Sequence, residues 1–477
     1  MTRAWRCLHN IQPALSRCFS SSAPRREIRS LADLPTRVYP RVKGIVCAHL
    51  VHRRVTTDAL WLETSNTDLL ALQWPSPPRN IFIVRKDNDD DVDAALIEYA
   101  NHVHSTYPSV SFIFEPYVAE EVHTHFKFPI YTPDTTTPSI QYQDKVDLTT
   151  TLGGDGTILH AASLFATARS VPPILSFSMG TLGFLGEWKF TEYKRAFRQV
   201  YASGAPSPLH PKSIDDLHML ETVPGGRDAV QAWSNIKGKA MGSSRNSRIL
   251  MRNRLRIGIF DAEGRRLPYS APSSPIEIGG RESEEIFALN EVLLHRGALP
   301  HLAHITILIG SPPNQRVLTT AIADGFLVST PTGSTAYSLS SGGSIVHPLV
   351  SSLLLTPICP RSLSFRPLVL PANTPVTLRI EPENRGKEIE VSVDGVRRAT
   401  GLTTGMEVRV VGEETVMGKA VGEREPGMPP SGGRDWIGGV ASIVRSGGAG
   451  GGEGGEDHWV GGLNSLLKFN YPFGEES

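Results

Sequence analysis

The sequence predicts two folded domains of different class. These are an α/β N-terminal domain with a parallel, Rossmann-like sheet over residues 41–212, and a mainly β, β-sandwich-like C-terminal domain over residues 213–415. In the first region, short β-branched runs alternate with stretches whose apolar residues recur at helical spacing, which is typical of a parallel sheet. In the second, short β-rich runs follow one another with turn residues between them, which favours antiparallel pairing.

The first domain has a regular order of strands and helices. Strands are predicted at 80–84, 110–114, 146–152 and 173–177, and helices at 91–107 and 158–168. The strand at 146–152 runs into a glycine-rich turn, and the next helix follows that turn. Because ligands bind at the carboxyl ends of parallel strands, we expect this turn to lie at a ligand site.

The second domain is predicted from seven short runs and is followed by a different kind of segment. The runs are 254–260, 286–294, 305–309, 325–329, 376–380, 389–393 and 406–410. Residues 421–456 are rich in glycine and are predicted to be flexible. Residues 457–472 contain Trp459, Leu463 and Leu467, and they are predicted to form a short docking helix.

The first thirty residues differ in composition from the rest of the chain. Five arginines precede the first acidic residue, Glu27, and Trp5, Leu8, Ile11 and Leu15 would share one face of a helix. An arginine-rich, serine-rich and amphipathic start predicts a mitochondrial transit peptide over residues 1–30, and hence a location in the mitochondrial matrix. A disordered basic tail is the alternative.

Bulk composition excludes several classes of function. Forty-eight basic residues balance forty-eight acidic ones, which argues against nucleic acid as a partner. No apolar run reaches the ~18 residues of a membrane span. The four cysteines have no metal-binding spacing, and neither do the histidines, so no protein-held metal site is predicted.

The segment Gly153-Gly154-Asp155-Gly156-Thr157 carries the first chemical signal. Glycines leave backbone N–H groups free to face phosphate oxygens, and a helix N-terminus attracts anions. The spacing fits neither a Walker P-loop nor a dinucleotide GxGxxG signature. Asp155 would accept a proton or hold a metal ion, although a tight turn with a solvated aspartate is the alternative.

The second signal is the segment 330–340, which reads Thr-Pro-Thr-Gly-Ser-Thr-Ala-Tyr-Ser-Leu-Ser. Its hydroxyl groups can donate to a polar ligand, and the ring of Tyr337 can stack on a base. An ordinary loop rich in serine and threonine is the alternative. The pair Asn290-Glu291 can bind ribose or base, or can be the solvated end of a strand. Asp324 and Asp394, each followed by glycine, are compatible with plain hairpin turns.

Taken in order, these segments resemble the NAD kinase family, in its fungal mitochondrial NADH kinase type. The family pattern is GGDGT, a GxLGF loop, an Asn-Glu or Asn-Asp pair, and a DG…TPTGSTAYSLSAGG stretch. In this chain the four elements are 153–157, 180–184, 290–291 and 324–343, and residues 356–368 also resemble eukaryotic members. Ser341 departs mildly from the pattern, where many members have alanine.

The resemblance implies a role for each matching position. Asp155 would be the catalytic proton acceptor, while Gly153, Gly154 and Thr157 would bind the phosphates of ATP. The residues implied to bind the dinucleotide are Gly156, His160, Phe184, Asn290, Glu291, Asp324, Thr335, Ala336, Tyr337 and Ser340. The implied partners are ATP with Mg²⁺, NADH or NAD⁺, and further copies of the chain in a homo-oligomer.

The implied reaction is transfer of the γ-phosphoryl group of ATP to the adenosine 2′-hydroxyl of NADH or NAD⁺. Two alternatives remain from the residues alone. A lipid or sugar kinase would explain Asp155 but not the segment 330–340. A catalytically silent NAD(H)-binding regulator would bind the dinucleotide without consuming ATP.

Overall fold

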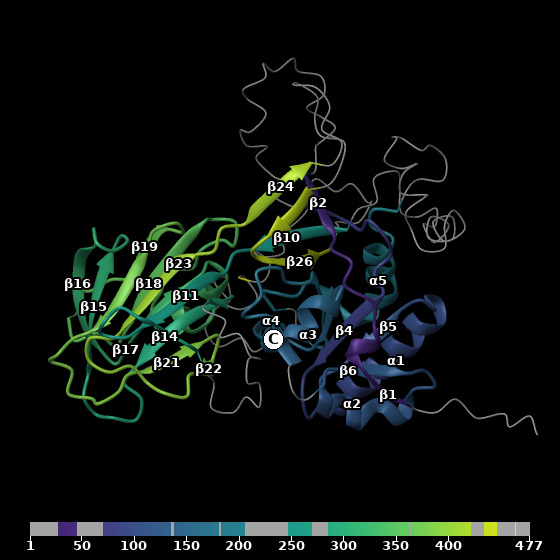
Figure 1. Cartoon of the computed structure of the whole chain (residues 1–477), viewed down its shortest axis with the longest axis horizontal. Helices are drawn as coiled ribbons and strands as arrows, with labels where there is room; N and C mark the ends of the chain where they lie inside the picture. The colour runs from purple at the N-terminus through teal and green to yellow at the C-terminus, as the bar shows by residue number, and fades with distance from the viewer. Residues whose placement is uncertain are drawn as a thin grey trace, which may run out of the picture.

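The computed structural model describes residues 27–44, 70–134, 138–180, 183–205, 247–269, 285–362, 364–420 and 434–445, together with Leu463. Figure 1 shows an α/β domain and a β-rich domain lying side by side. This arrangement confirms the predicted fold class. Within the described residues, no helix is long and apolar enough to cross a membrane.

Five parallel strands form the centre of the first domain, in the order β6-β5-β4-β7-β8. Their bounds are β4 Asn80–Arg85, β5 Ser111–Ile113, β6 Ile130–Thr132, β7 Leu148–Leu152 and β8 Ile174–Ser178. The chain builds outward from β4 to β6 and then returns to place β7 on the other side of β4. The order therefore reverses between β4 and β7, which makes this junction the topological switch point where ligands bind.

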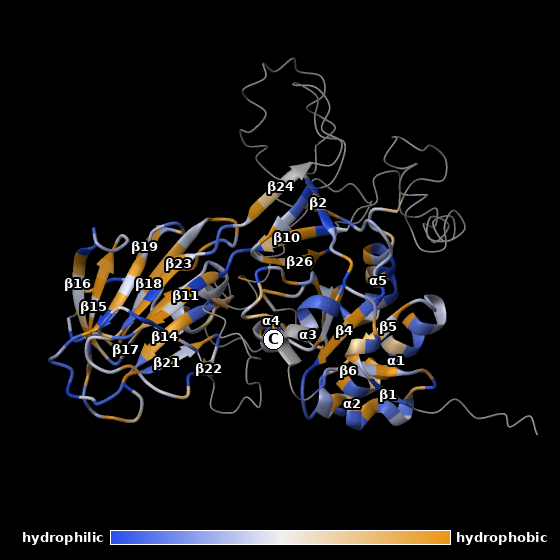
Figure 2. Ribbon diagram, in the orientation of Figure 1, coloured by the Kyte–Doolittle hydropathy of each residue, from blue (hydrophilic) through white to orange (hydrophobic). Residues whose placement is uncertain are grey.

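Helices cover both faces of this sheet, as the alternation of buried side chains in β4 requires. Ile81 and Ile83 pack into one core with α1, α2 and α5, whereas Phe82 and Val84 pack into a second core with α3 and α4. The helix bounds are α1 Asp90–Thr106, α2 Pro116–Val122, α3 Pro138–Lys145, α4 Asp155–Ser163 and α5 Tyr193–Tyr201. Figure 2 shows the apolar colour concentrated on the strands between them.

An antiparallel extension continues the same sheet beyond β8, in the order β26-β10-β3-β2-β25-β24. The bounds are β2 Arg41–Gly44, β3 Leu70–Gln73, β10 Arg248–Arg252, β24 Val416–Ala420, β25 Arg434–Ile437 and β26 Val440–Val444. The predicted boundaries are therefore wrong in two places. Residues 248–252 belong to the first sheet, and the predicted flexible segment 421–456 contains a core strand.

Strand β26 shows why the flexible segment was mispredicted. All five of its residues are buried, and it lies between β8 and β10 at the centre of the sheet. Its short run of Val, Ala, Ser, Ile and Val is enclosed by glycine-rich sequence on both sides. Burial between two strands overrides the local composition, because each neighbour supplies hydrogen bonds and apolar contacts that the sequence around β26 does not reveal.

The second domain is a sandwich of two antiparallel sheets, which matches the prediction. One sheet contains β11 Leu255–Phe260, β12 Arg266–Leu267, β13 Ile286–Ala288, β15 Ala303–Ile309, β16 Arg316–Ala323, β20 Val376–Ile380 and β23 Glu407–Gly412. The other contains β14 Glu291–His295, β17 Gly325–Ser329, β18 Ser352–Ile358, β19 Leu368–Pro371, β21 Glu390–Val393 and β22 Val396–Arg397. One apolar core joins their inner faces.

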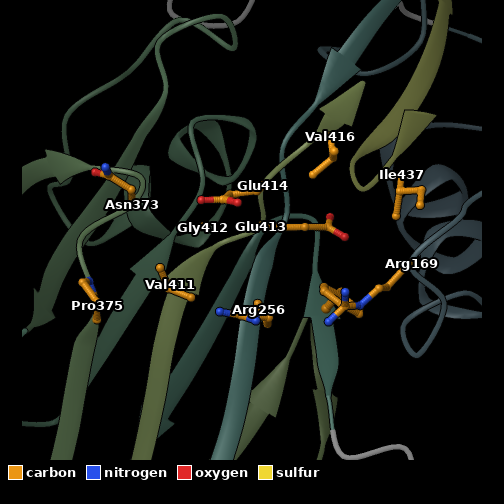
Figure 3. A pocket seen from close by; sticks show the side chains of 11 residues that line it. Arg169, Arg256, Asn373, Pro375, Val411, Gly412, Glu413, Glu414, Val416 and Ile437 are labelled. Carbon is orange, nitrogen blue, oxygen red and sulfur yellow. The ribbon is translucent and has the colours of Figure 1, made fainter. Parts of the chain in front are cut away.

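A buried ion pair fastens the two domains where the chain crosses between them. Arg254, between β10 and β11, pairs with Glu413, between β23 and β24, at 2.8 Å. Arg254 also donates to the carbonyls of Phe165 and Ala168, which follow α4. A cavity of about 350 Å³ lies beside this pair, with Arg169 on one side and Arg256 below (Figure 3).

The two terminal predictions fall largely outside the described residues. Residues 1–26 and the predicted docking helix at 457–472, apart from Leu463, are not among them. Strand β1, Ile28–Ser30, pairs in parallel with β6, so residue 30 is part of the folded sheet. This strand overlaps the last three residues of the predicted transit peptide, whose end stays a prediction.

The burial of β26 generates a stability prediction. Ile443→Ala should lower the free energy of unfolding by about 2–5 kcal/mol. The side chain of Ile443 is only 2% exposed, so its truncation leaves a cavity in the core. Ile437→Ala, in β25 and 52% exposed, should change the free energy of unfolding by less than about 0.5 kcal/mol. Urea unfolding measures both, and equal effects would contradict the assignment of β26 to the core.

Candidate active site

The glycine-rich turn lies at the switch point between β4 and β7. The N–H of Gly153 donates to the carbonyl of Phe177, and the N–H of Lys86 donates to the carbonyl of Leu152. Gly153 has a φ of +154°, and a Cβ there would lie 2.2 Å from Oγ1 of Thr157. Only glycine fits this position, and Gly154 caps α4, so the turn presents its backbone at the N-terminus of a helix.

Asp155, the first residue of α4, is held by the loop that follows β8. Its Oδ2 accepts from the N–H of Phe184 at 2.9 Å, and its Oδ1 accepts from the N–H of Leu185 at 3.1 Å. Two hydrogen bonds fix the plane of the carboxylate. Each oxygen retains a further lone pair for another donor.

The approach of this loop to Asp155 depends on Gly183. A Cβ at Gly183 would lie 2.1 Å from Oδ1 of Asp155. A side chain at Gly183 would therefore collide with the carboxylate. Gly183, the second glycine of the GxLGF pattern, is therefore required on steric grounds.

The segment 330–340 forms a compact turn against residues 289–290. The N–H of Thr330 donates to the carbonyl of Asn290, and its Oγ1 donates to the carbonyl of Leu289 at 2.6 Å. A Cβ at Gly333 would lie 2.3 Å from the carbonyl oxygen of Asn290. The helical turns that follow are η7, Thr332–Thr335, and α8, Tyr337–Ser340. Tyr337 is 40% exposed, so its ring is available for contact.

Asn290 and Glu291 are held in place through their backbone by Asp394. The carboxylate of Asp394 accepts from the N–H groups of Leu289, Asn290 and Glu291 at 2.6, 2.7 and 3.0 Å. The interpretation of Asp394 as a plain hairpin turn is therefore incomplete. Because their backbones are fixed, the side chains of Asn290 and Glu291 are left for other partners.

Those side chains carry buried polar atoms without partners. Oδ1 of Asn290 and Oε2 of Glu291 have no hydrogen bond among the described residues. Burial and, to a smaller extent, the charge of Asp394 together raise the pKa of Glu291 to about 8. Buried polar atoms without partners are uncommon in folded proteins, so this pair has the features of a ligand contact.

Arg252, at the end of β10, connects the two halves of the site. Its guanidinium donates to the carbonyl of Phe184 at 3.2 Å and to Oγ1 of Thr332 at 3.5 Å, while Nε donates to Ser442 at 3.1 Å. Burial lowers its pKa to about 10, so the group stays charged at neutral pH. Among the described residues it makes no ion pair, which leaves a buried positive charge near Asp155.

The structure brings most of the predicted residues together. Arg252 links the loop that holds Asp155 to the turn that contains Thr335, Ala336, Tyr337 and Ser340. Asn290 packs directly on that turn. Gly153, Gly154, Gly156 and Thr157 surround Asp155 in sequence and in space.

Two predicted residues lie apart from this group. Nε2 of His160 contacts the carboxylate of Glu115 at 3.0 Å, and this hydrogen bond raises the pKa of His160. Asp324 pairs with Arg296 at 2.6 Å, next to Gly325 at the start of β17. Glu291 pairs with Ser329, which is at the opposite end of β17 from Gly325. Asp324 and Glu291 are therefore not neighbours within one chain.

Sequence reasoning missed Arg252 and the role of Asp394. Arg252 is one of several arginines in the stretch 245–256, and no local pattern distinguishes it. For Asp394, the positive φ of 46° marks a turn, but its three acceptor contacts reach back about a hundred residues along the chain.

Comparison with known proteins agrees with this geometry. The family model for the ATP-NAD kinase N-terminal domain matches residues 81–205, and the model for the ATP-NAD kinase C-terminal domain matches residues 289–415. The chain belongs to the ATP-NAD kinase family. It is an ATP-dependent NAD(H) kinase, and the resemblance inferred from the motifs is confirmed.

Individual ATP-NAD kinases match most of the chain. NADH kinase pos5, mitochondrial, of Schizosaccharomyces pombe is 36% identical over 85% of this chain and 79% of its own length. NADH kinase POS5, mitochondrial, of Saccharomyces cerevisiae is 33% identical over 88% and 87%. A crystal structure of yeast NADH kinase complexed with NADH has a TM-score of 0.64, with 29% identity, over 94% of this chain and 98% of that one.

The close approach of Gly183 to Asp155 can be tested by substitution. Gly183→Ala should lower kcat by about 10²-fold, because a displacement of a reacting group by about 1 Å has that effect. Gly386→Ala is the control, since the nearest atom to an added Cβ there is 3.6 Å away. Steady-state kinetics measure both, and an unchanged kcat in Gly183→Ala would contradict the geometry.

The raised pKa of Glu291 predicts a pH dependence of stability. In the unfolded chain a glutamate titrates near ~4.3, so between about pH 5 and pH 8 the folded protein retains a proton that the unfolded chain has lost. The carboxyl of Glu291 therefore lowers stability as pH rises through this window. Glu291→Gln should gain stability relative to wild type over the same window.

Urea unfolding of the nucleotide-free protein at several pH values measures this difference. Glu388→Gln, at an exposed position, serves as the control for replacing a carboxyl group by an amide. A difference between Glu291→Gln and wild type that does not change with pH would show that Glu291 titrates as an ordinary glutamate.

Proposed function

We propose that this kinase transfers the γ-phosphoryl group of ATP to the adenosine 2′-hydroxyl of NADH or NAD⁺, giving NADPH or NADP⁺. The observation that carries the proposal is the fixed carboxylate of Asp155, placed at the switch point and joined through Arg252 to the turn 330–340. A lipid or sugar kinase would need the first feature but not the second. Membership of the ATP-NAD kinase family favours the same acceptor.

Asp155 acts as the general base in this proposal. The attacking 2′-hydroxyl is a poor nucleophile at neutral pH, and a positioned base contributes about 10²–10⁴-fold. The hydroxyl oxygen bonds to the γ-phosphorus, its proton passes to a carboxylate oxygen of Asp155, and the bond from the γ-phosphorus to the bridging oxygen breaks to release ADP. The N–H groups of Phe184 and Leu185 hold the carboxylate in one orientation for this transfer.

Positive groups around the turn would neutralise the transferred phosphoryl group. The N-terminus of α4 and the free N–H groups of the turn face an anion favourably. Arg252 supplies a buried charge, and Lys86 directly follows β4 beside Gly153, where its Cβ is 3.1 Å from the position of an added Cβ. Alignment and charge, rather than covalent chemistry, account for most of the rate of phosphoryl transfer.

Mg²⁺ would reach the site with ATP. Among the described residues, no group of three or more His, Cys, Asp or Glu could hold a metal ion. The described residues therefore fit a cation that is held mainly by the nucleotide phosphates, and the cation would neutralise their charge.

We also propose a mitochondrial matrix location and a homo-oligomeric state. The arginine-rich leader supports the first, and the names of both fungal relatives include "mitochondrial". The position of Asp324, far from Glu291 within one chain, supports the second, because a neighbouring chain could bring such a residue to the dinucleotide.

The decisive assay offers NADH and NAD⁺ in parallel with Mg-ATP. Wild-type protein should form NADPH or NADP⁺, and Asp155→Asn should lower kcat by at least about 10²-fold while NADH binding survives. Asp33→Asn, at an exposed position, is the matched control. Near-normal turnover by Asp155→Asn would show that Asp155 is not the general base. If wild-type protein binds the dinucleotide without consuming ATP, the catalytically silent regulator is favoured instead.

A further inference from the structure

A second cavity, of about 460 Å³, lies away from Asp155 on the α/β domain. It is formed by the segment 37–41, which leads into β2, by Ser170 after α4, and by Asp435 to Ile437 of β25. Its size is within the range of small-molecule sites. None of the residues assigned to the phosphoryl transfer lines it.

Arg37 gives this cavity a buried cation. The residue is 6% exposed, its Nη1 donates to the carbonyl of Ser170 at 2.9 Å, and its guanidinium lies 4.7 Å from the centre of the Tyr39 ring. Its Nε is buried without a hydrogen-bond partner among the described residues. A buried guanidinium with an unused donor is costly to fold, which is typical of a group that serves a ligand.

The other charged groups lining the cavity neutralise each other. Arg41 pairs with Asp435 at 3.2 Å, so the net charge of the lining comes from Arg37. The cavity in Figure 3 differs in this respect, because Arg169 and Arg256 share Glu285, and Glu413 is paired with Arg254. In the Arg37 cavity, the carboxylates of Asp147 and Asp144 lie near Arg37 without lining the cavity, and among the described residues Arg37 makes no ion pair.

Two aromatic side chains complete the site. Tyr39 is 51% exposed, and the buried Trp436 also lines the cavity. Aromatic faces beside a cation suit a flat ring that bears a negative group, since the ring stacks and the anion pairs with the guanidinium.

A short path of contacts leads from this cavity to the active site. β25 continues through the turn Gly438-Gly439 into β26, where Ser442 accepts from Nε of Arg252. Arg252 in turn donates to the carbonyl of Phe184, whose N–H holds Asp155. A molecule packed on Trp436 therefore touches the strand that leads directly into β26, whose Ser442 accepts a hydrogen bond from Arg252.

We propose that the cavity at Arg37, Tyr39 and Trp436 is an accessory site for a planar aromatic anion, and that its occupancy modulates the active site through the chain segment that runs from β25 into β26. The anionic group pairs with Arg37, and the ring packs between Tyr39 and Trp436. The second half of this proposal rests on the proposed kinase function, whereas the binding half does not.

Calorimetry tests the binding half on the full chain, with saturating NADH present to fill the dinucleotide site. The probes are 2-naphthoate and its uncharged match, 2-naphthamide. We expect 2-naphthoate to bind at least about tenfold more tightly, a difference of ~1.4 kcal/mol. Tyr39→Ala and Arg37→Gln should each weaken 2-naphthoate by about tenfold or more, while Tyr117→Ala, at another exposed tyrosine, should not.

Equal binding of the two probes, or unchanged binding in Tyr39→Ala, would overturn the site. Arg37 also holds Ser170, so if Arg37→Gln fails to fold, Tyr39→Ala decides. Steady-state formation of NADPH tests the second half. We expect 2-naphthoate to change kcat or KM for NADH by about twofold or more in wild type, and not in Tyr39→Ala.

If 2-naphthoate binds but changes neither kcat nor KM, the accessory site stands and the proposed modulation of the active site is wrong. If wild type forms no NADPH under any condition, the proposed function fails, while calorimetry still decides the accessory site.

Discussion

The candidate active site lies where two domains meet, and the buried guanidinium of Arg252 joins them. The residue ends β10 in the α/β sheet, yet its donors reach the loop that holds Asp155 and the turn that begins at Thr332. Without this link, each domain would carry half of a site. The ion pair of Arg254 with Glu413, two residues further along the chain, fastens the same crossing.

Steric limits then decide which residues the site can contain. Gly153, Gly183 and Gly333 each approach another atom so closely that an added Cβ would lie 2.1–2.3 Å from it. The motifs are therefore glycine-rich for two reasons. Glycines expose backbone N–H groups to phosphate, and they also let Asp155, Thr157 and Asn290 pack against the chain.

Local sequence patterns predicted those elements whose conformation depends mainly on neighbouring residues in the chain. The strand, turn and helix around Asp155 followed from β-branched residues, glycines and helical spacing, and the structure has them as β7 and α4. Strand β26 could not be predicted in this way, because its stability comes from neighbours far away in the sequence. The run 286–294 was predicted as one strand, yet it divides at Asn290, where Asp394 binds three successive N–H groups.

The candidate site residues also divide into those in local motifs and those that act through contacts between distant segments. Asp155, Asn290 and the turn 330–340 belong to contiguous motifs, which is why the sequence could single them out as candidates. Arg252 and Asp394 act through contacts between distant segments, so no spacing could reveal them. His160 and Asp324 were assigned by their place in a motif, but their side chains pair with Glu115 and Arg296.

The measurement that tests the central claim is the comparison of stability and activity in Arg252→Met. Methionine removes the hydrogen bonds that Arg252 donates to Phe184, Thr332 and Ser442, and buried acceptors left unpaired should lower the free energy of unfolding by about 1–3 kcal/mol. The account predicts this loss of stability together with a loss of kcat/KM of at least about 10²-fold from the missing charge and the loosened loop. A protein that melts at a clearly lower temperature but keeps its kcat/KM would contradict it, because Arg252 would then serve the fold rather than the site.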